Sequence, residues 1–190
     1  MKKGVLTELR KIEEEVKGCQ KCRLYKERKN AVPGNGVYDT KIMLIGEAPG
    51  RNEDLEGLPF VGQAGKLLEQ MLNNIGLSRN DIFITNVVKC RPPENRDPMT
   101  DEIEACKPYL FRQIELVDPK LIILVGKYSV STVLGINLKI SHLKGRVFIK
   151  EGRYIFCTYH PAFVLRNYSS YIDEYTYHFE KIKKIIEKIQ

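Results

Sequence analysis

Tryptophan is absent from this 190-residue chain, histidine occurs only three times, and long apolar segments are missing. The longest purely apolar runs, such as residues 121–125, are far too short to cross a bilayer. The N-terminal residues begin basic but turn acidic and amphipathic, without the apolar core of a secretion signal. The sequence therefore predicts neither a membrane-spanning nor an exported protein, and we expect a cytoplasmic location.

Internal repeats, low-complexity segments and long linkers are also lacking, so we expect one domain over residues 1–190. Hydrophobic residues make up 43% and charged residues 29% of the chain, which is typical of a folded, soluble protein. The net charge of +7 is compatible with a polyanionic partner. A basic surface without any such function has the same charge, so charge alone does not decide the function.

Five cysteines without an export signal argue against a disulfide framework. Cys157 lies in an apolar strand pattern and is expected in the core. Cys19 and Cys22 form a C-x2-C pair in polar sequence, and Cys90 and Cys106 follow further along the chain. Four thiols in two groups indicate a tetrahedral zinc site or an iron–sulfur cluster, and the wide second spacing favours the cluster. Either group would join the N-terminal helix to the segment 86–106.

Apolar periodicity predicts alternating helices and strands. We expect helices over residues 5–17, 64–75, 100–117, 127–134 and 172–189, and strands over residues 42–45, 82–85, 121–125, 146–149 and 154–158. Thr100 is the predicted N-cap of the third helix, Gly76 is the predicted C-cap of the second, and Glu151-Gly152 is a candidate hairpin turn. This alternation is typical of an α/β fold with a mainly parallel sheet.

The segment GEAPGRNEDLEGLPFVGQAG, residues 46–65, follows the first predicted strand. A glycine-rich turn in this position is typical of phosphate binding, but its four acidic residues would repel a phosphate. It also lacks the terminal Gly-Lys-Ser/Thr of a Walker loop and the G-x-G-x-x-G of a dinucleotide site. In a parallel sheet, ligands bind beyond the carboxyl ends of the strands. We therefore expect residues 46–65, 86–99 and 159–167 to form one site.

Three sequence segments and the four cysteines together resemble the family 4 uracil-DNA glycosylases, which are iron–sulfur enzymes. The segments are GEAPG…GLPFVGQAG, ITNVVKCRPPENRDP and TYHPAFVLRN, and the resemblance extends from Cys19 to Arg166. It implies a three-layer α/β/α sandwich around a central, mainly parallel, four-stranded sheet. It also implies a [4Fe-4S] cluster on Cys19, Cys22, Cys90 and Cys106, for which zinc is the alternative. The implied activity is excision of uracil from DNA, leaving an abasic site.

The same resemblance implies roles for single residues. Gly46 to Pro49 would line the pocket for the base and the attacking water, Phe60 would stack on uracil, and Asn86 would bind its polar edge. Asparagine offers one donor and one acceptor, which match O4 and N3–H of uracil and mismatch the amino group of cytosine. His160, as a neutral imidazole, would stabilise the negative charge that develops on uracil O2.

Activation of the water is the open point of this mechanism. Better-known uracil glycosylases carry an acidic residue two positions after the first glycine of this motif, where this chain has Ala48. Glu47 and Glu53 are the remaining candidate catalytic acids. Glu53 resembles the family glutamate that crowds the C5 edge of uracil and helps to exclude thymine, and for Glu47 a role of the backbone N–H alone is an equal alternative.

DNA contacts are expected at two helix starts and in the segment that follows His160. The candidates are Gly62, Gln63, Ala64 and Gly65 at the first helix start, Lys127 at the second, and Leu165 and Arg166 as a wedge. Ordinary capping or packing is the alternative for each. We expect a monomer that acts on uracil-containing DNA, single- or double-stranded, near the nucleoid, with a sliding clamp as a candidate protein partner.

Two other functions are compatible with parts of this pattern. One is a glycosylase of the same superfamily that accepts hypoxanthine or other damaged bases. The other is a non-catalytic nucleic-acid-binding module with a four-cysteine metal site. The second alternative accounts for the charge and the cysteines, but it leaves Phe60, Asn86 and His160 near three strand ends without a purpose.

Overall fold

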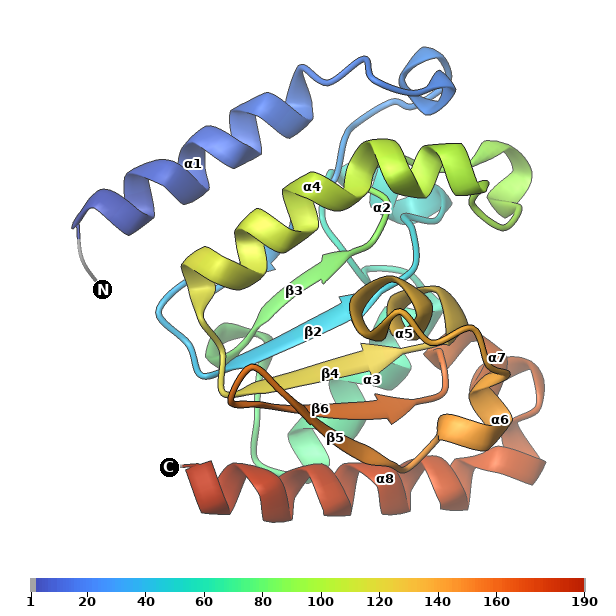
Figure 1. The fold of residues 1–190 in the computed structure, drawn as a ribbon. Helices are drawn as coiled ribbons and strands as arrows, with labels where there is room; N and C mark the ends of the chain where they lie inside the picture. Colours follow the sequence, from blue (N-terminus) through green and yellow to red (C-terminus); the bar gives the residue numbers. More distant parts are fainter. Residues whose placement is uncertain (1–2, 190) are drawn as a thin grey trace.

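The structure is a computed structural model that describes residues 3–189 and contains a six-stranded sheet between helical layers (Figure 1). The strand order is β1-β3-β2-β4-β6-β5. The strands are β1 (Asn35–Gly36), β2 (Ile42–Gly46), β3 (Phe83–Asn86), β4 (Leu121–Val125), β5 (Val147–Lys150) and β6 (Arg153–Thr158). The four central strands are parallel, and the two edge strands β1 and β5 run antiparallel to their neighbours. The α/β class is confirmed.

The four-stranded sheet that the resemblance implied was wrong, because the sheet has six strands. Of the two antiparallel edge strands, β5 was among the five strands expected from periodicity, and β1 was not. β1 has only two residues and no apolar pattern. A Cβ on Gly36 would overlap the carbonyl of Ile82, so this close pairing depends on glycine. The β5–β6 hairpin turns through Glu151 and Gly152 as predicted, with φ values of 52° and 74°. Positive φ at both central residues is typical of a two-residue hairpin turn.

Helices cover both faces of the sheet (Figure 1). The α-helices are α1 (Lys3–Lys17), α2 (Arg51–Glu56), α3 (Gln63–Asn74), α4 (Thr100–Val117), α5 (Lys127–Leu134), α6 (Ile140–Leu143), α7 (Pro161–Arg166) and α8 (Tyr168–Ile189), and the 3-10 turns are η1 (Arg23–Lys26), η2 (Arg79–Asp81) and η3 (Pro93–Asn95). Met43 and Ile45 of β2 pack on the layer with α1 and α4, whereas Ile42 and Leu44 pack on the layer with α3 and α8. This alternation follows from the two-residue period of a strand.

Two helix caps lie one residue before the predicted ones: Met99 in place of Thr100 for α4, and Ile75 in place of Gly76 for α3. Helix α4 begins at Thr100, but its N-cap is Met99, whose N–H donates to the Glu102 carboxylate at 2.8 Å. Helix α3 ends at Asn74, and Gly76 follows with φ 79°. The six-residue helices α2 and α7 were not predicted, because six residues are too few to display a helical period. In residues 3–189, no helix is long and apolar enough to span a membrane.

The carboxyl ends of the four parallel strands point to one side of the molecule (Figure 1). Residues 46–65 leave β2 there, residues 86–99 leave β3, and residues 159–167 leave β6. The loops that were predicted to form one site therefore start from the same edge of the sheet.

Candidate active site

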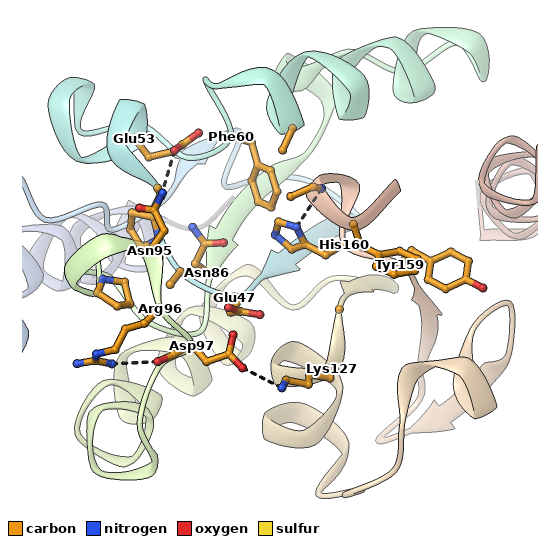
Figure 2. Close-up of a pocket in the computed structure, with 18 of the residues that line it drawn as sticks. Glu47, Glu53, Phe60, Asn86, Asn95, Arg96, Asp97, Lys127, Tyr159 and His160 are labelled. Atoms are coloured by element: carbon orange, nitrogen blue, oxygen red, sulfur yellow. Dashed lines mark hydrogen bonds and ion pairs between the residues drawn. The ribbon is translucent and has the colours of Figure 1, made fainter. Parts of the chain in front are cut away.

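The three loops line one cavity of about 630 Å³ at this edge. Its walls include Glu47 to Gly50, Glu53, Phe60, Asn86 and His160, together with residues from the 92–97 loop and the start of α5. A volume of this size is ordinary for a small-molecule site. Figure 2 shows the rings of Phe60 and His160 on one side of Asn86, with Glu47, Asp97 and Lys127 on the other.

Asn86 ends β3 and lies beside Gly46, the last residue of β2. Its side chain is 2% exposed, and its Oδ1 has no hydrogen-bond partner among the described residues. A Cβ on residue 46 would overlap this oxygen, so glycine is needed for the two strand ends to lie side by side. A buried acceptor without a partner is costly in a folded protein. Asn86 therefore has hydrogen-bonding capacity to offer a ligand.

The rings of Phe60 and His160 lie next to each other in the wall of the cavity. Their ring centroids are 5.7 Å apart and their planes are inclined by 30°. Phe60 has φ 53°, a left-handed conformation that is strained for an aromatic residue. Gly65 packs directly under the Phe60 carbonyl, where a Cβ would overlap the oxygen. An unusual backbone, held by close packing, thus presents this ring to the cavity.

His160 is the N-cap of α7, and its Nδ1 accepts the N–H of Ala162 at 3.2 Å. An occupied Nδ1 lone pair leaves the ring proton on Nε2. Burial, assisted by the positive charge of Arg166, lowers the pKa of His160 to about 4. The side chain is therefore a neutral donor at physiological pH.

The two acidic candidates occupy different environments. Burial, together with the nearby charge of Asp97, raises the pKa of Glu47 to about 7. The Glu47 carboxylate makes no hydrogen bond or ion pair within residues 3–189. Glu53 instead accepts three backbone N–H groups, from Gly50 at 3.1 Å and from Val61 and Gly62 at 2.9 Å each. The Glu47 carboxylate therefore has no partner among the described residues, whereas Glu53 organises the loop.

Of the predicted DNA-contact residues, Ala64, Lys127 and Arg166 line the cavity, and several candidates have partners within the chain. The Gly62 N–H, a candidate phosphate donor, binds Glu53. Gly65 is buried, Gln63 is exposed, and Ala64 lines the cavity. Lys127 pairs with Asp97 at 2.9 Å. Leu165 packs partly against the core, and Arg166 is exposed beside the cavity.

Asp97 is a site residue that the sequence reasoning missed. Its carboxylate accepts from Lys127 Nζ at 2.9 Å and from Tyr128 OH at 2.6 Å, which ties the 92–97 loop to the start of α5. These contacts hold its pKa below the usual range. The proline-rich sequence around it had marked an irregular loop, but nothing in it indicated the partner residues thirty positions away.

A second, smaller cavity is lined by Cys19, Cys22, Cys90 and Cys106, the four cysteines that were expected to form one metal site. The Arg28 guanidinium donates to Cys90 Sγ at 3.1 Å, and the Lys89 N–H donates to Cys106 Sγ at 3.2 Å. No group of three or more metal-ligating side chains within residues 3–189 is arranged to hold a single metal ion. The fifth cysteine, Cys157, is buried in the core of the sheet.

Burial raises the pKa of the Cys106 thiol to about 12. The pKa values of Cys22 and Cys90 are also raised, again mainly by burial. Thiolates in such a place need a compensating positive charge, and a metal centre supplies one. The four thiols in one cavity and the N–H donors to sulfur are compatible with a cluster of several metal ions, whereas no three of the described side chains are arranged to hold a single ion.

Lys89 connects the two cavities. Its fully buried ammonium donates to the backbone oxygen of Asn86 at 2.8 Å and to Gln113 Oε1 at 2.7 Å. Its backbone N–H is the donor to Cys106. The end of β3 in the large cavity and the sulfur-lined cavity are thus fixed to the same residue.

The chain is similar in sequence to proteins of one known family. Residues 33–188 match the family described as the uracil DNA glycosylase superfamily. The chain is 55% identical to the type-4 uracil-DNA glycosylase of Saccharolobus solfataricus over 82% of this chain and 76% of that protein. It is 45% identical to the enzyme of the same name from Archaeoglobus fulgidus over 94% of each chain. It is 40% identical to that of Thermotoga maritima over 93% of this chain and 94% of that protein. The chain therefore belongs to the type-4 uracil-DNA glycosylases.

Proposed function

We propose that the protein flips uracil out of DNA and hydrolyses its N-glycosidic bond, releasing uracil and leaving an abasic site. Membership of the family supports this activity. The single observation that carries it is the buried, unpartnered Oδ1 of Asn86 in the wall of the cavity. The N3–H of uracil would donate to this oxygen, and the side-chain amide would donate to O4. Cytosine lacks the N3–H and carries a donor at position 4, so it leaves both groups unpaired.

Stacking is the second element of the proposal. A flipped base costs a few kcal/mol to extrude, and an aromatic platform recovers part of that cost. Phe60 is the proposed platform, because its ring faces into the cavity beside His160. Glu53, held by three backbone N–H groups, forms a fixed wall of the same cavity and would crowd a methyl group at C5.

We assign leaving-group stabilisation to His160. As the glycosidic bond between C1′ and N1 breaks, the bonding electrons go to the base, and negative charge develops on uracil O2. The Nε2–H of a neutral imidazole donates to this oxygen, which is the role of a donor in an oxyanion hole. A pKa of about 4 keeps His160 neutral, so it stabilises the anion by a hydrogen bond without transferring its proton.

Glu47 is the proposed general base. With Ala48 unable to hold the water, Glu47 is the cavity-lining acid whose carboxylate has no hydrogen-bond partner among the described residues. Its pKa of about 7 suits a group that accepts a proton at neutral pH. The water oxygen would bond to C1′ while one of its protons passes to Glu47, and the released uracil anion would take its proton from solvent.

We further propose that Cys19, Cys22, Cys90 and Cys106 hold a [4Fe-4S] cluster, with zinc as the alternative. The cavity that these four cysteines share supports a common metal group. Such a group would supply the positive charge that keeps the thiols ionised. By its position it would link the end of α1, the segment after β3, and α4, which is a structural role. Metal analysis and the visible spectrum of anaerobically prepared protein distinguish iron–sulfur from zinc.

The remaining partners are part of the same proposal. Uracil-containing DNA, single- or double-stranded, would approach the cavity mouth between Lys127 and Arg166. The single-domain organisation, the monomeric state and association with a sliding clamp stay predictions.

An oligonucleotide with one uracil tests the activity. We expect alkali-sensitive cleavage at the uracil and none in a matched oligonucleotide with thymine at that position. Intact uracil DNA would refute the proposal, and DNA binding without any product would support the non-catalytic module. Release of hypoxanthine at a comparable rate would show the broader damaged-base specificity.

A further inference from the structure

Arg79 is a residue outside the cavity that holds the backbone of the proposed stacking platform. It begins η2, just beyond the loop that follows α3. Its Nη1 donates to the carbonyl of Phe60 at 2.8 Å, and its Nη2 donates to the carbonyl of Pro59 at 2.5 Å. Arg79 is not among the cavity-lining residues, so it acts on a bound base through other groups: the two carbonyls, and its charge interaction with Glu53.

The turn that carries Phe60 is clamped from both sides. Arg79 binds the carbonyls of residues 59 and 60, whereas Glu53 binds the N–H groups of Val61 and Gly62. Between these contacts Phe60 keeps φ 53°, and Gly65 makes room for its carbonyl. A strained residue keeps its conformation only where its surroundings enforce it. The bidentate guanidinium is one of those enforcing contacts.

We propose that Arg79 is a positioning residue that fixes the ring of Phe60 for stacking on the flipped base. The inference rests on the proposed function, since it assigns Arg79 a task in that same site. A ring that is already oriented loses little freedom when a base stacks on it, and such preorganisation strengthens binding. The arginine is suited to this task because one planar group reaches two consecutive carbonyls, which a single ammonium donor does less well.

The test is a double-mutant cycle with Arg79→Met and Phe60→Ala. Stacking acts on the flipped base in the ground state and in the transition state alike, so its loss raises KM and leaves kcat nearly unchanged. For Arg79→Met alone we expect KM for uracil DNA and the inhibition constant of free uracil each to rise about tenfold. In the Phe60→Ala background, the same substitution should change neither constant further.

Two further variants separate positioning from general stability. Arg79→Lys keeps the charge and should restore part of the affinity for free uracil. Arg153→Met is the matched control. Like Arg79, Arg153 is partly buried, and its guanidinium makes two hydrogen bonds, to Asp118 and Glu151. It lies at the N-terminal end of β6, away from the cavity at the C-terminal end. The substitution should lower the melting temperature without changing uracil inhibition. If Arg79→Met does not fold, Arg79→Lys enters the cycle under the same criterion.

Additive effects of Arg79 and Phe60 substitutions would overturn the inference, as would unchanged uracil inhibition in a folded Arg79 variant. Wild-type protein is assayed first, so that the two proposals fail separately. Absence of uracil release by the wild type refutes the proposed function itself. Normal release by the wild type with additive variants refutes only the role of Arg79.

Discussion

The two cavities differ in how their polar groups are satisfied. In the base cavity, Asn86 Oδ1 has no partner in residues 3–189 and the pKa of Glu47 is near neutrality. In the cysteine cavity, sulfur atoms of Cys90 and Cys106 accept hydrogen bonds and burial disfavours the charged thiolates. Groups left without partners at the first cavity are available for a transient ligand. At the second cavity, burial favours the neutral thiols, so ionised thiolates are expected there only if a bound positive group compensates them.

We therefore expect the base cavity to govern the reaction rate and the cysteine cavity to govern the stability of the fold. Substitutions in the base cavity should change the rate while the fold persists, because that cavity already carries unsatisfied groups. Substitutions among the four cysteines should change stability first. Lys89 links the two cavities, since its side chain bonds to the Asn86 backbone oxygen and its backbone N–H bonds to Cys106.

The largest expected effect is on stability. Cys106→Ala should reduce the bound metal and lower the free energy of unfolding by roughly 4 kcal/mol, the range in which loss of a metal site falls. Thermal unfolding and metal content measure this. Cys157→Ala is the matched control, a buried thiol outside the cavity, and should cost about 1 to 2 kcal/mol with metal content intact. Equal metal content in both variants would contradict the assignment.

His160→Ala should have the largest effect on chemistry. Loss of the proposed hydrogen bond to the developing anion should lower kcat by about 10³-fold. Single-turnover kinetics measure this step directly. The melting temperature should stay within a few degrees of the wild type, in contrast to Cys106→Ala. A fall in rate of less than about threefold would exclude His160 from this role.

Glu47→Gln should lower kcat by about 10²-fold and change its pH dependence. In the wild type, kcat should fall as pH decreases through about 7, because a base with that pKa becomes protonated. In the Glu47→Gln variant, kcat should no longer fall as the pH decreases through about 7.

Stability gives an independent check on Glu47. Its folded-state pKa is raised above its ordinary value, so the folded state binds the proton more tightly, and stability is lost as pH rises from the ordinary value of 4.5 to about 7. Glu47→Gln should therefore raise the melting temperature at pH 8 more than at pH 5. The same gain at both pH values would argue against the raised pKa.

Asn86→Asp should have the smallest effect among these, a change of selectivity. A carboxylate accepts from the cytosine amino group and repels O4 of uracil, so the preference for uracil over cytosine should fall by about tenfold. Competing oligonucleotides with uracil or cytosine at one position measure the ratio. Unchanged selectivity would mean that Asn86 does not bind the polar edge of the base.

Much of the architecture could be predicted because it depends on local patterns. Buried apolar runs identified β2, β3 and β4, and the parallel order then brought residues 46–65, 86–99 and 159–167 to one edge. The four cysteines that the sequence grouped as one candidate metal site line one shared cavity, and the metal itself stays a prediction. Strand β1 could not be predicted, since a two-residue strand has no period and forms only because β3 offers it an edge.

The sequence by itself determined the fold class, the family and the set of candidate residues, because periodicity and motifs are properties of neighbouring residues. Only the tertiary structure decided how Glu47 and Glu53 differ. Glu53 is tied to N–H groups eight and nine residues away, and Glu47 remains unpaired beside Asp97. Hydrogen bonds and desolvation depend on which groups the folded loops bring within about 3 Å, and that distance is set by the closed chain and not by the order of its residues.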